Sequence, residues 1–219
     1  MGQILRFRTA VLATVAAMAF SGAAAGQAAK PAGRDYTDAD VRFMQGMIMH
    51  HAQAVVMSDW AATHGASPDL VILCKRIALS QRDEIAVMRQ WLTERGLSAP
   101  DPLHMTSPAS GPITDTSPMH MPGMDMGTGP MMMMAGMLSA DDMRALDAAR
   151  GATFDRLYLT GMIKHHQGAI AMVAELFATP GGGQQADLFG LATDVDAGQR
   201  VEIARMQAML NTLNTTHPT

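Results

Sequence analysis

A duplication within the chain constrains its fold more than any other feature of the sequence. The segment DVRFMQGMIMHHAQAVVM at 40–57 aligns without a gap with DRLYLTGMIKHHQGAIAM at 155–172, and eight identities share an offset of 115 residues. A second pair, QRDEIAVM at 81–88 and QRVEIARM at 199–206, shares an offset of 118 residues. Because both pairs occur in the same order, the chain contains two copies of one structural unit, and its fold has to accommodate that unit twice.

The first copy predicts a helical hairpin over residues 35–97. Thr37 is expected to cap a helix that runs to about His64, because its side-chain oxygen can accept a hydrogen bond from the first turn. The stretch GASPD at 65–69 supplies a turn, and it places Pro68 at the first position of the next helix, where proline is favoured. Gly96 is the expected end of that helix, since glycine readily adopts the left-handed conformation found after helices.

The second copy predicts a similar hairpin over residues 139–214. Ser139, with Asp142 three residues later, forms a capping box that begins a helix. This helix is expected to break near Gly151 and to resume as far as about residue 178, before the turn TPGGG. A last helix is predicted over about residues 185–213. No stretch of the chain shows the strict alternation of apolar and polar residues that predicts a strand.

The spacing of residues along these helices predicts how the hairpins pack. One seam is formed by Phe43, Met47, His50, Ala54, Met57 and Ala61, and a matching seam by Tyr158, Met162, His165, Ala169, Met172 and Leu176. Steps of four and three place each set on one face of a helix. Two such hairpins joined by one long crossover, residues 98–138, predict an all-α fold, a ferritin-like four-helix bundle.

Polar residues occupy these seams, although the core of a bundle is normally aliphatic. Each first helix places a histidine inward, and each second helix places a glutamine and a glutamate inward: His50, Gln81 and Glu84 in the first copy, His165, Gln199 and Glu202 in the second. Buried ionisable groups are costly unless they are paired, hydrogen-bonded or bound to a metal. The bundle is therefore predicted to contain a polar layer that appears twice.

Residues 1–25 are predicted to be a Sec-type signal peptide. Arg6 and Arg8 form a positive start, the apolar run at 10–20 is too short to span a bilayer, and residues 23–25 offer a small-residue cleavage pattern. We therefore expect a periplasmic or secreted protein with no membrane segment after cleavage. The formal net charge of −4 and the aromatic content of 5% supply neither the basic field nor the stacking surfaces of nucleic-acid binding.

The crossover has an unusual composition. It holds seven of the eleven prolines, which exclude a continuous helix, and its segment 119–137 contains nine methionines in nineteen residues. Linkers are normally polar, so this density of methionine calls for a functional explanation. His120 between Met119 and Met121 is a candidate metal-binding group, as are Met124 and Met126.

The residue types point to copper. Thioether sulfur is a soft donor that suits Cu(I) or Ag(I), and imidazole binds copper in both oxidation states. The chain has a single cysteine, Cys74, so its sulfur chemistry is that of methionine, which fits an oxidising compartment. Residues three and four positions apart are neighbours on a helix surface, as Met47 and His50 are expected to be. The predicted ligands in the bundle are Met44, Met47, His50, His51, Met57, Met162, His165, His166 and Met172, and the residues predicted to orient them are Glu84, Glu202, Gln81 and Gln199.

The repeated motif GMIxHHxxAxxM, followed by QRxEIAxM, resembles the bacterial family known as domain of unknown function 305. The resemblance covers about residues 37–96 and 153–213. It implies an exported protein with a ferritin-like four-helix fold, in a family that includes copper-binding proteins of the CopM type linked to copper resistance. By resemblance the ligands are Met47, His50, His51 and Met57, and their counterparts Met162, His165, His166 and Met172.

We therefore expect a copper-binding protein, not an enzyme, that sequesters or shuttles Cu(I), with Cu(II) or Ag(I) as further ions and a copper-handling protein as a partner. One alternative is a ferritin-like di-metal oxidoreductase, for which the chain has Glu84 and Glu202 but no Glu-x-x-His sequence. Another is a non-metal interaction module whose methionine-rich loop grips apolar partners. The residues also allow methionines that only fill the core and histidine pairs that bond the two glutamates without metal.

Overall fold

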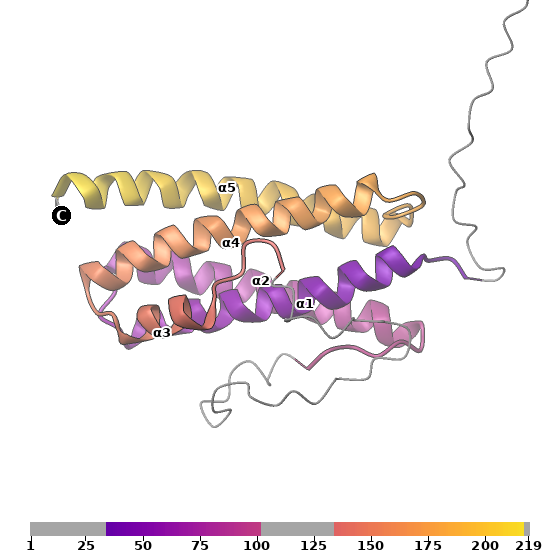
Figure 1. The fold of residues 1–219 in the computed structure, drawn as a ribbon, viewed down its shortest axis with the longest axis horizontal. Coiled ribbons are helices and arrows are strands. Elements are labelled where there is room, and N and C mark those ends of the chain that lie inside the picture. The colour runs from indigo at the N-terminus through magenta and orange to yellow at the C-terminus, as the bar shows by residue number, and fades with distance from the viewer. Residues whose placement is uncertain (1–33, 102–133, 217–219) are drawn as a thin grey trace, which may run out of the picture.

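The structure is a computed structural model that describes residues 34–101 and 134–216. Its elements in chain order are α1 (Asp38–Asp59), the short 3-10 helix η1 (Trp60–Ala62), α2 (Pro68–Glu94), α3 (Ala140–Ala148), α4 (Ala152–Ala178) and α5 (Ala186–Thr216) (Figure 1). The described residues contain no strand. The predicted all-α fold is confirmed.

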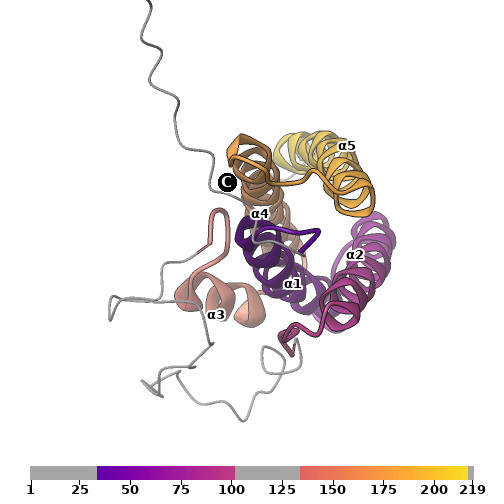
Figure 2. The same cartoon turned by 90° about the vertical axis from the view of Figure 1, so that its right-hand side faces the viewer.

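The four long helices pack as two hairpins, α1 with α2 and α4 with α5 (Figure 1). The view along the bundle shows α1 beside α4 and α2 on the same side as α5 (Figure 2). Helices α1 and α4 run in opposite directions and contact each other directly, whereas the short helix α3 lies outside the bundle against α1 and α4. The chain returns from the end of α2 to the opposite end of the bundle before α4 begins, which is the long crossover of a ferritin-like bundle.

Local capping signals set the starts of α1 and α3. The hydroxyl of Thr37 accepts a hydrogen bond from the backbone N–H of Asp40 at 3.2 Å, and the Asp40 carboxylate accepts one from the Thr37 N–H at 2.8 Å. Ser139 and Asp142 form the same reciprocal pair at the start of α3. Gly151, with φ of +56°, separates α3 from α4 in a backbone conformation that favours glycine.

Two buried aspartates tie the hairpins together at opposite ends of the bundle. Asp40 in α1 also accepts a hydrogen bond from the backbone N–H of Gly183, in the turn of the second hairpin, at 2.7 Å. Asp155 in α4 is its counterpart in the duplication, and both of its oxygens lie 3.2 Å from the backbone N–H of Ser67, in the turn of the first hairpin. Each copy therefore satisfies a backbone donor in the turn of the other copy.

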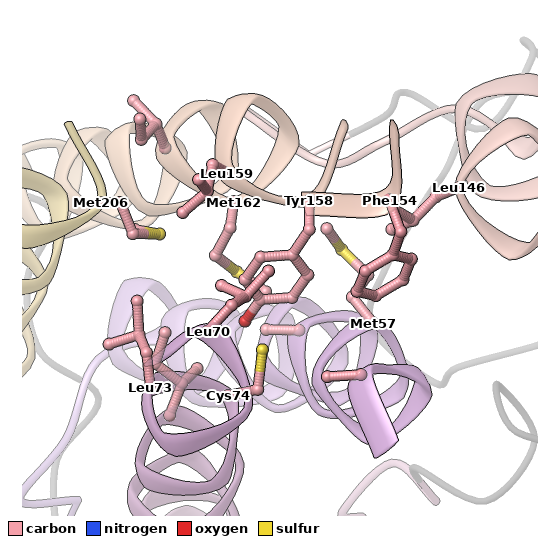
Figure 3. Packing of buried hydrophobic residues seen from close by; sticks show 14 of the residues in the cluster. Met57, Leu70, Leu73, Cys74, Leu146, Phe154, Tyr158, Leu159, Met162 and Met206 are labelled. Carbon is pink, nitrogen blue, oxygen red and sulfur yellow. The ribbon is translucent and has the colours of Figure 1, made fainter. Parts of the chain in front are cut away.

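The apolar core consists of two clusters. The tyrosine cluster includes Met57, Leu73, Cys74, Tyr158, Met162 and Met206, and most of these side chains are drawn in Figure 3. The tryptophan cluster includes Phe43, Met44, Met47, Met88, Trp91 and Val195. Both clusters draw residues from α1, α2, α4 and α5, so the two hairpins share one core rather than folding around separate ones.

Two predictions fall outside the described residues. The signal peptide at 1–25 is one, and the crossover ligands are the other: Met119, His120, Met121, Met124 and Met126. Both stay predictions. Among the helices that the structure describes, none combines the length and the hydropathy needed to cross a bilayer.

Candidate metal centre

A layer of polar side chains lies where the two apolar clusters meet. It contains His50, His51, Gln81 and Glu84 from the first copy and His165, His166, Gln199 and Glu202 from the second. All four imidazoles have an exposed fraction of 0%, whereas the side chains of the two glutamates keep 24%. The layer therefore reaches solvent at its glutamates and is closed at its histidines.

In each copy the second histidine is held by a glutamate. His51 Nε2 lies 2.6 Å from Glu84 Oε2, and His166 Nε2 lies 2.7 Å from Glu202 Oε2. Because a carboxylate only accepts, the imidazole N–H at Nε2 is the donor in both bonds. A carboxylate in this position fixes the orientation of an imidazole that binds metal through its other nitrogen. The two glutamates thus make the contact that their predicted orienting role requires, while metal binding itself stays a prediction.

The first histidines of the two copies meet at the contact between α1 and α4. The ring centroids of His50 and His165 are 3.8 Å apart, with the ring planes inclined at 40°. His165 donates from Nε2 to the backbone carbonyl of His50 at 2.9 Å. His50 donates from Nε2 to the carbonyl of Ala135 at 3.0 Å. Both rings therefore carry their hydrogen on Nε2.

The opposite nitrogen of each ring has no hydrogen-bond partner in the part of the chain that the structure describes. In a neutral imidazole protonated at Nε2, Nδ1 carries a free lone pair. The Nδ1 atoms of His50, His51, His165 and His166 are all buried and find no hydrogen-bond partner among the described residues. Leaving a buried acceptor unpaired costs about 1–3 kcal/mol. The layer therefore contains four imidazole nitrogens whose lone pairs are available as donors.

The two central histidines are held in the neutral form that binds metal. Burial lowers the pKa of His50 from 6.5 to about 3, helped by the nearby His51 and opposed by the hydrogen bond to Ala135. Burial also lowers the pKa of His165 well below 6.5, with a further contribution from His50. A proton therefore competes poorly with a metal ion for these two rings near neutral pH.

The glutamines of the layer are also unsatisfied. Both side-chain polar atoms of Gln81 and of Gln199 are buried without a hydrogen-bond partner among the described residues. Within residues 34–101 and 134–216, no group of three or more His, Cys, Asp or Glu side chains is arranged to hold a metal ion. The imidazoles that do meet are a pair, His50 with His165.

The predicted methionine ligands of the helices lie in the apolar clusters on either side of this layer. Met44 and Met47 are fully buried in the tryptophan cluster, and Met57 and Met162 are fully buried in the tyrosine cluster. Met172 is half-buried at the edge of the tryptophan cluster. These side chains fill core space in the described structure, and coordination by their sulfurs stays a prediction.

Two glycines of the repeated motif allow α1 and α4 to approach each other. A Cβ placed on Gly46 would lie 3.3 Å from Met172 Cε, and one placed on Gly161 would lie 3.5 Å from Met57 Cε. The glycines are counterparts in the duplication, as are the methionines. Met172 therefore covers the glycine of the first copy and Met57 covers the glycine of the second, which gives both methionines a packing role.

Residues 134–138, which we call the strap, lie over the contact between α1 and α4, just before α3 (Figure 1). Gln53 holds the strap from α1, because its amide accepts from the Leu138 N–H at 2.8 Å and donates to the Leu138 carbonyl at 3.1 Å. Gly136, with φ of +80°, packs so closely on α4 that a Cβ there would lie 2.5 Å from the Lys164 carbonyl oxygen. A Cβ on Gly168 would overlap with the Ala135 carbonyl oxygen.

The strap was not predicted from the sequence, although one signal for it was present. Gln53 and Gly168 occupy the same position in the two copies, yet one is a long amide and the other has no side chain. This position is used differently in each copy because a single strap lies across both helices. Gln53 binds the strap, and Gly168 makes room for it.

The chain is similar to a curated protein in part of its sequence and to several solved structures over most of its length. A curated relative, the uncharacterized protein L153 of Acanthamoeba polyphaga mimivirus, is 38% identical over 58 residues, which is 26% of this chain and 38% of the length of that protein. A DUF305 fragment from Deinococcus radiodurans matches at 25% identity with a TM-score of 0.61, covering 81% of this chain and 98% of the other. A putative secreted DUF305 protein from Streptomyces coelicolor matches at 23% identity with a TM-score of 0.62, covering 80% and 94%.

A further solved structure is CopM in the Cu(II)-bound form, at 24% identity and a TM-score of 0.57, covering 79% of this chain and 96% of the other. Its Cu(I)-bound and silver-bound forms match at 22% identity and a TM-score of 0.54. At these identities the likeness to CopM is one of fold. The model of the family "Domain of unknown function (DUF305)" matches residues 40–210, and this chain belongs to that family.

Proposed function

We propose that this protein binds copper, chiefly as Cu(I), and that it sequesters or carries the metal rather than catalysing a reaction. The observation that carries this proposal is the set of four buried Nδ1 atoms in one layer of the bundle, none of which has a hydrogen-bond partner within residues 34–101 and 134–216. Such an arrangement costs stability in the metal-free protein, and a bound cation removes that cost.

The chemistry of the neighbouring donors favours a soft ion. Imidazole nitrogen and thioether sulfur are the donors at hand, and this combination suits Cu(I) and Ag(I) better than Mg²⁺ or Ca²⁺. The one thiol contributes little, because burial raises the pKa of Cys74 to about 12 and so keeps it protonated. Imidazole also accepts Cu(II), so the same layer can hold copper in either oxidation state.

The relatives support the proposal at the level of chemistry. CopM, which shares the fold, has been solved with Cu(II), with Cu(I) and with silver. The relative from Streptomyces coelicolor is described as a putative secreted protein. Together with the predicted signal peptide, this supports a place in the periplasm or outside the cell, where the protein would pass copper to or from a copper-handling partner.

The proposal is tested by titrating the full chain with Cu(I) under anaerobic, reducing conditions against a chromophoric copper chelator. We expect more than one copper ion per chain. In the double variant His50→Gln/His165→Gln the stoichiometry should fall by at least one ion. The variant keeps side-chain donors near the two carbonyls that the imidazoles bond, so the fold should persist.

His64 provides the matched control, because it is also buried but both of its nitrogens have partners. Its Nδ1 lies 2.9 Å from Thr63 Oγ1, and its Nε2 lies 2.8 Å from the Asp147 carbonyl oxygen. His64→Gln should therefore leave the copper stoichiometry unchanged. A parent protein that takes up no copper, or a double variant that takes up as much as the parent, would contradict the proposal.

A further inference from the structure

The strap brings a methionine of the crossover against the bundle. Met134 is the last residue of a run of four methionines and the first residue of the strap. Its sulfur would lie 3.4 Å from a Cβ placed on Gly46 of α1, and the Met172 methyl carbon Cε would lie 3.3 Å from the same point. Because Cε is bonded directly to sulfur, two thioethers, one from the strap and one from α4, lie beside the same glycine.

The two methionines beside Gly46 are partly exposed to solvent. Met134 and Met172 are both half-buried, unlike Met47, Met57 and Met162, which are fully buried. Gly46 contributes no side chain, so no Cβ stands where the two thioethers approach α1. A thioether that is packed on all sides can only fill space, whereas one with an open side is also free to coordinate.

The equivalent place in the other copy differs in one donor. Gly161 is the counterpart of Gly46, and it is covered by Met57 Cε at 3.5 Å and by Leu138 Cδ2 at 3.0 Å. Both of those side chains are buried. Leucine thus stands where Met134 stands on the other side, so only the Gly46 side presents two sulfurs. The structure itself shows that leucine is compatible with packing at such a position.

We propose that Met134 and Met172 form a binding site for a soft monovalent cation, Cu(I) or Ag(I), at the point where the crossover joins the bundle. Two neutral thioethers are suited to such a cation and are poor ligands for hard divalent ions. Ala135, the next residue of the strap, accepts the hydrogen bond of His50, so this outer site lies next to the histidine layer. The inference rests on the proposed function, since it adds a site for the same ions.

The test uses the full chain labelled with ¹³C at the methionine methyl groups and titrated with Ag(I). The methyl resonances of Met134 and Met172 should shift together, at the same silver concentration. In Met134→Leu the response of Met172 should weaken by about tenfold or more in silver concentration, because even the loss of a group that only orients a ligand costs about 10- to 100-fold in affinity. Far-UV circular dichroism should be unchanged.

Met209→Leu is the matched control, since Met209 is also half-buried but packs against the tyrosine cluster. It should leave the response of Met172 as in the parent. The inference is overturned if Met172 responds at the same silver concentration in Met134→Leu, or if silver binds elsewhere while neither resonance moves. Neither of those outcomes bears on the histidine layer, which the chelator titration tests separately, whereas a chain that binds neither silver nor Cu(I) contradicts the proposed function as well.

Discussion

The two central histidines predict how the stability of the metal-free protein depends on pH. Burial holds the pKa of His50 at about 3 in the folded chain, against 6.5 for an exposed imidazole. The folded state therefore binds fewer protons than the unfolded state between these values. The stabilising contribution is fully present above pH 6.5 and is lost as the pH falls toward 3, which is the reverse of a histidine that gains an acidic partner.

The magnitude follows from the size of the shift. Each pH unit below the unfolded pKa costs about 1.4 kcal/mol for a ring that stays neutral, so His50 alone costs about 2.7 kcal/mol near pH 4.5. His165, whose pKa is lowered in the same direction by burial, adds to this loss. Since domains of this size are stable by about 5–15 kcal/mol, the loss is a large fraction of the total.

The measurement is urea unfolding of the metal-free chain, followed by far-UV circular dichroism from neutral pH down to about pH 4.5. The variant His50→Gln keeps a side-chain donor for the Ala135 carbonyl but cannot titrate. The free energy of unfolding of the variant should therefore fall less steeply with decreasing pH, and its slope should be smaller than that of the parent by about 1.4 kcal/mol per pH unit. If the parent and the variant lose stability with the same slope below pH 6.5, the argument from burial is refuted.

Three further predictions concern single side chains. Asp40→Ala removes two backbone hydrogen bonds to a buried carboxylate and should destabilise the chain by about 3 kcal/mol in urea unfolding, while the exposed Asp38→Ala should stay within about 0.5 kcal/mol. Gly168→Ala should destabilise the chain by about 1–3 kcal/mol because the new methyl group overlaps with the strap, and it should speed amide exchange in residues 134–138. Gly198→Ala, whose Cβ would meet none of the described residues within 4 Å, should stabilise the chain by up to about 1 kcal/mol; equal effects would refute the packing argument. Glu84→Gln should weaken Cu(I) binding by about 10- to 100-fold in the chelator competition, and an unchanged affinity would show that the glutamate does not orient His51 for metal.

The helices could be predicted from the sequence because their ends depend on residues that are close together in the chain. The N-cap at Thr37 and the glycine at 151 act within a few residues, and both appear in the structure as expected. The duplication then fixed the class of fold, since a hairpin that occurs twice and cannot bury its seam alone has to pack against its copy.

The contacts between the copies were beyond the reach of sequence reasoning. Asp40 and Asp155 are identical residues in the alignment, but which backbone donors they meet depends on how one hairpin is set against the other. A bond between histidine and glutamate was expected, but the seams contain His50 and His165, whereas the glutamates bond His51 and His166. The choice of Nε2 as the bonded nitrogen likewise depends on the orientation of the rings. Spacing along a helix gives the face of a residue but not the atom that its side chain presents.

The exchange of aspartates and methionines between the copies has a consequence for assembly. At this interface the aspartate of each hairpin bonds the turn of the other hairpin, and the methionine of each hairpin covers the glycine of the other. The surface is therefore self-complementary, as in an isologous homodimer, and the two halves behave like subunits fused into one polypeptide. The strap, which can lie across the junction in only one direction, makes these halves unequal.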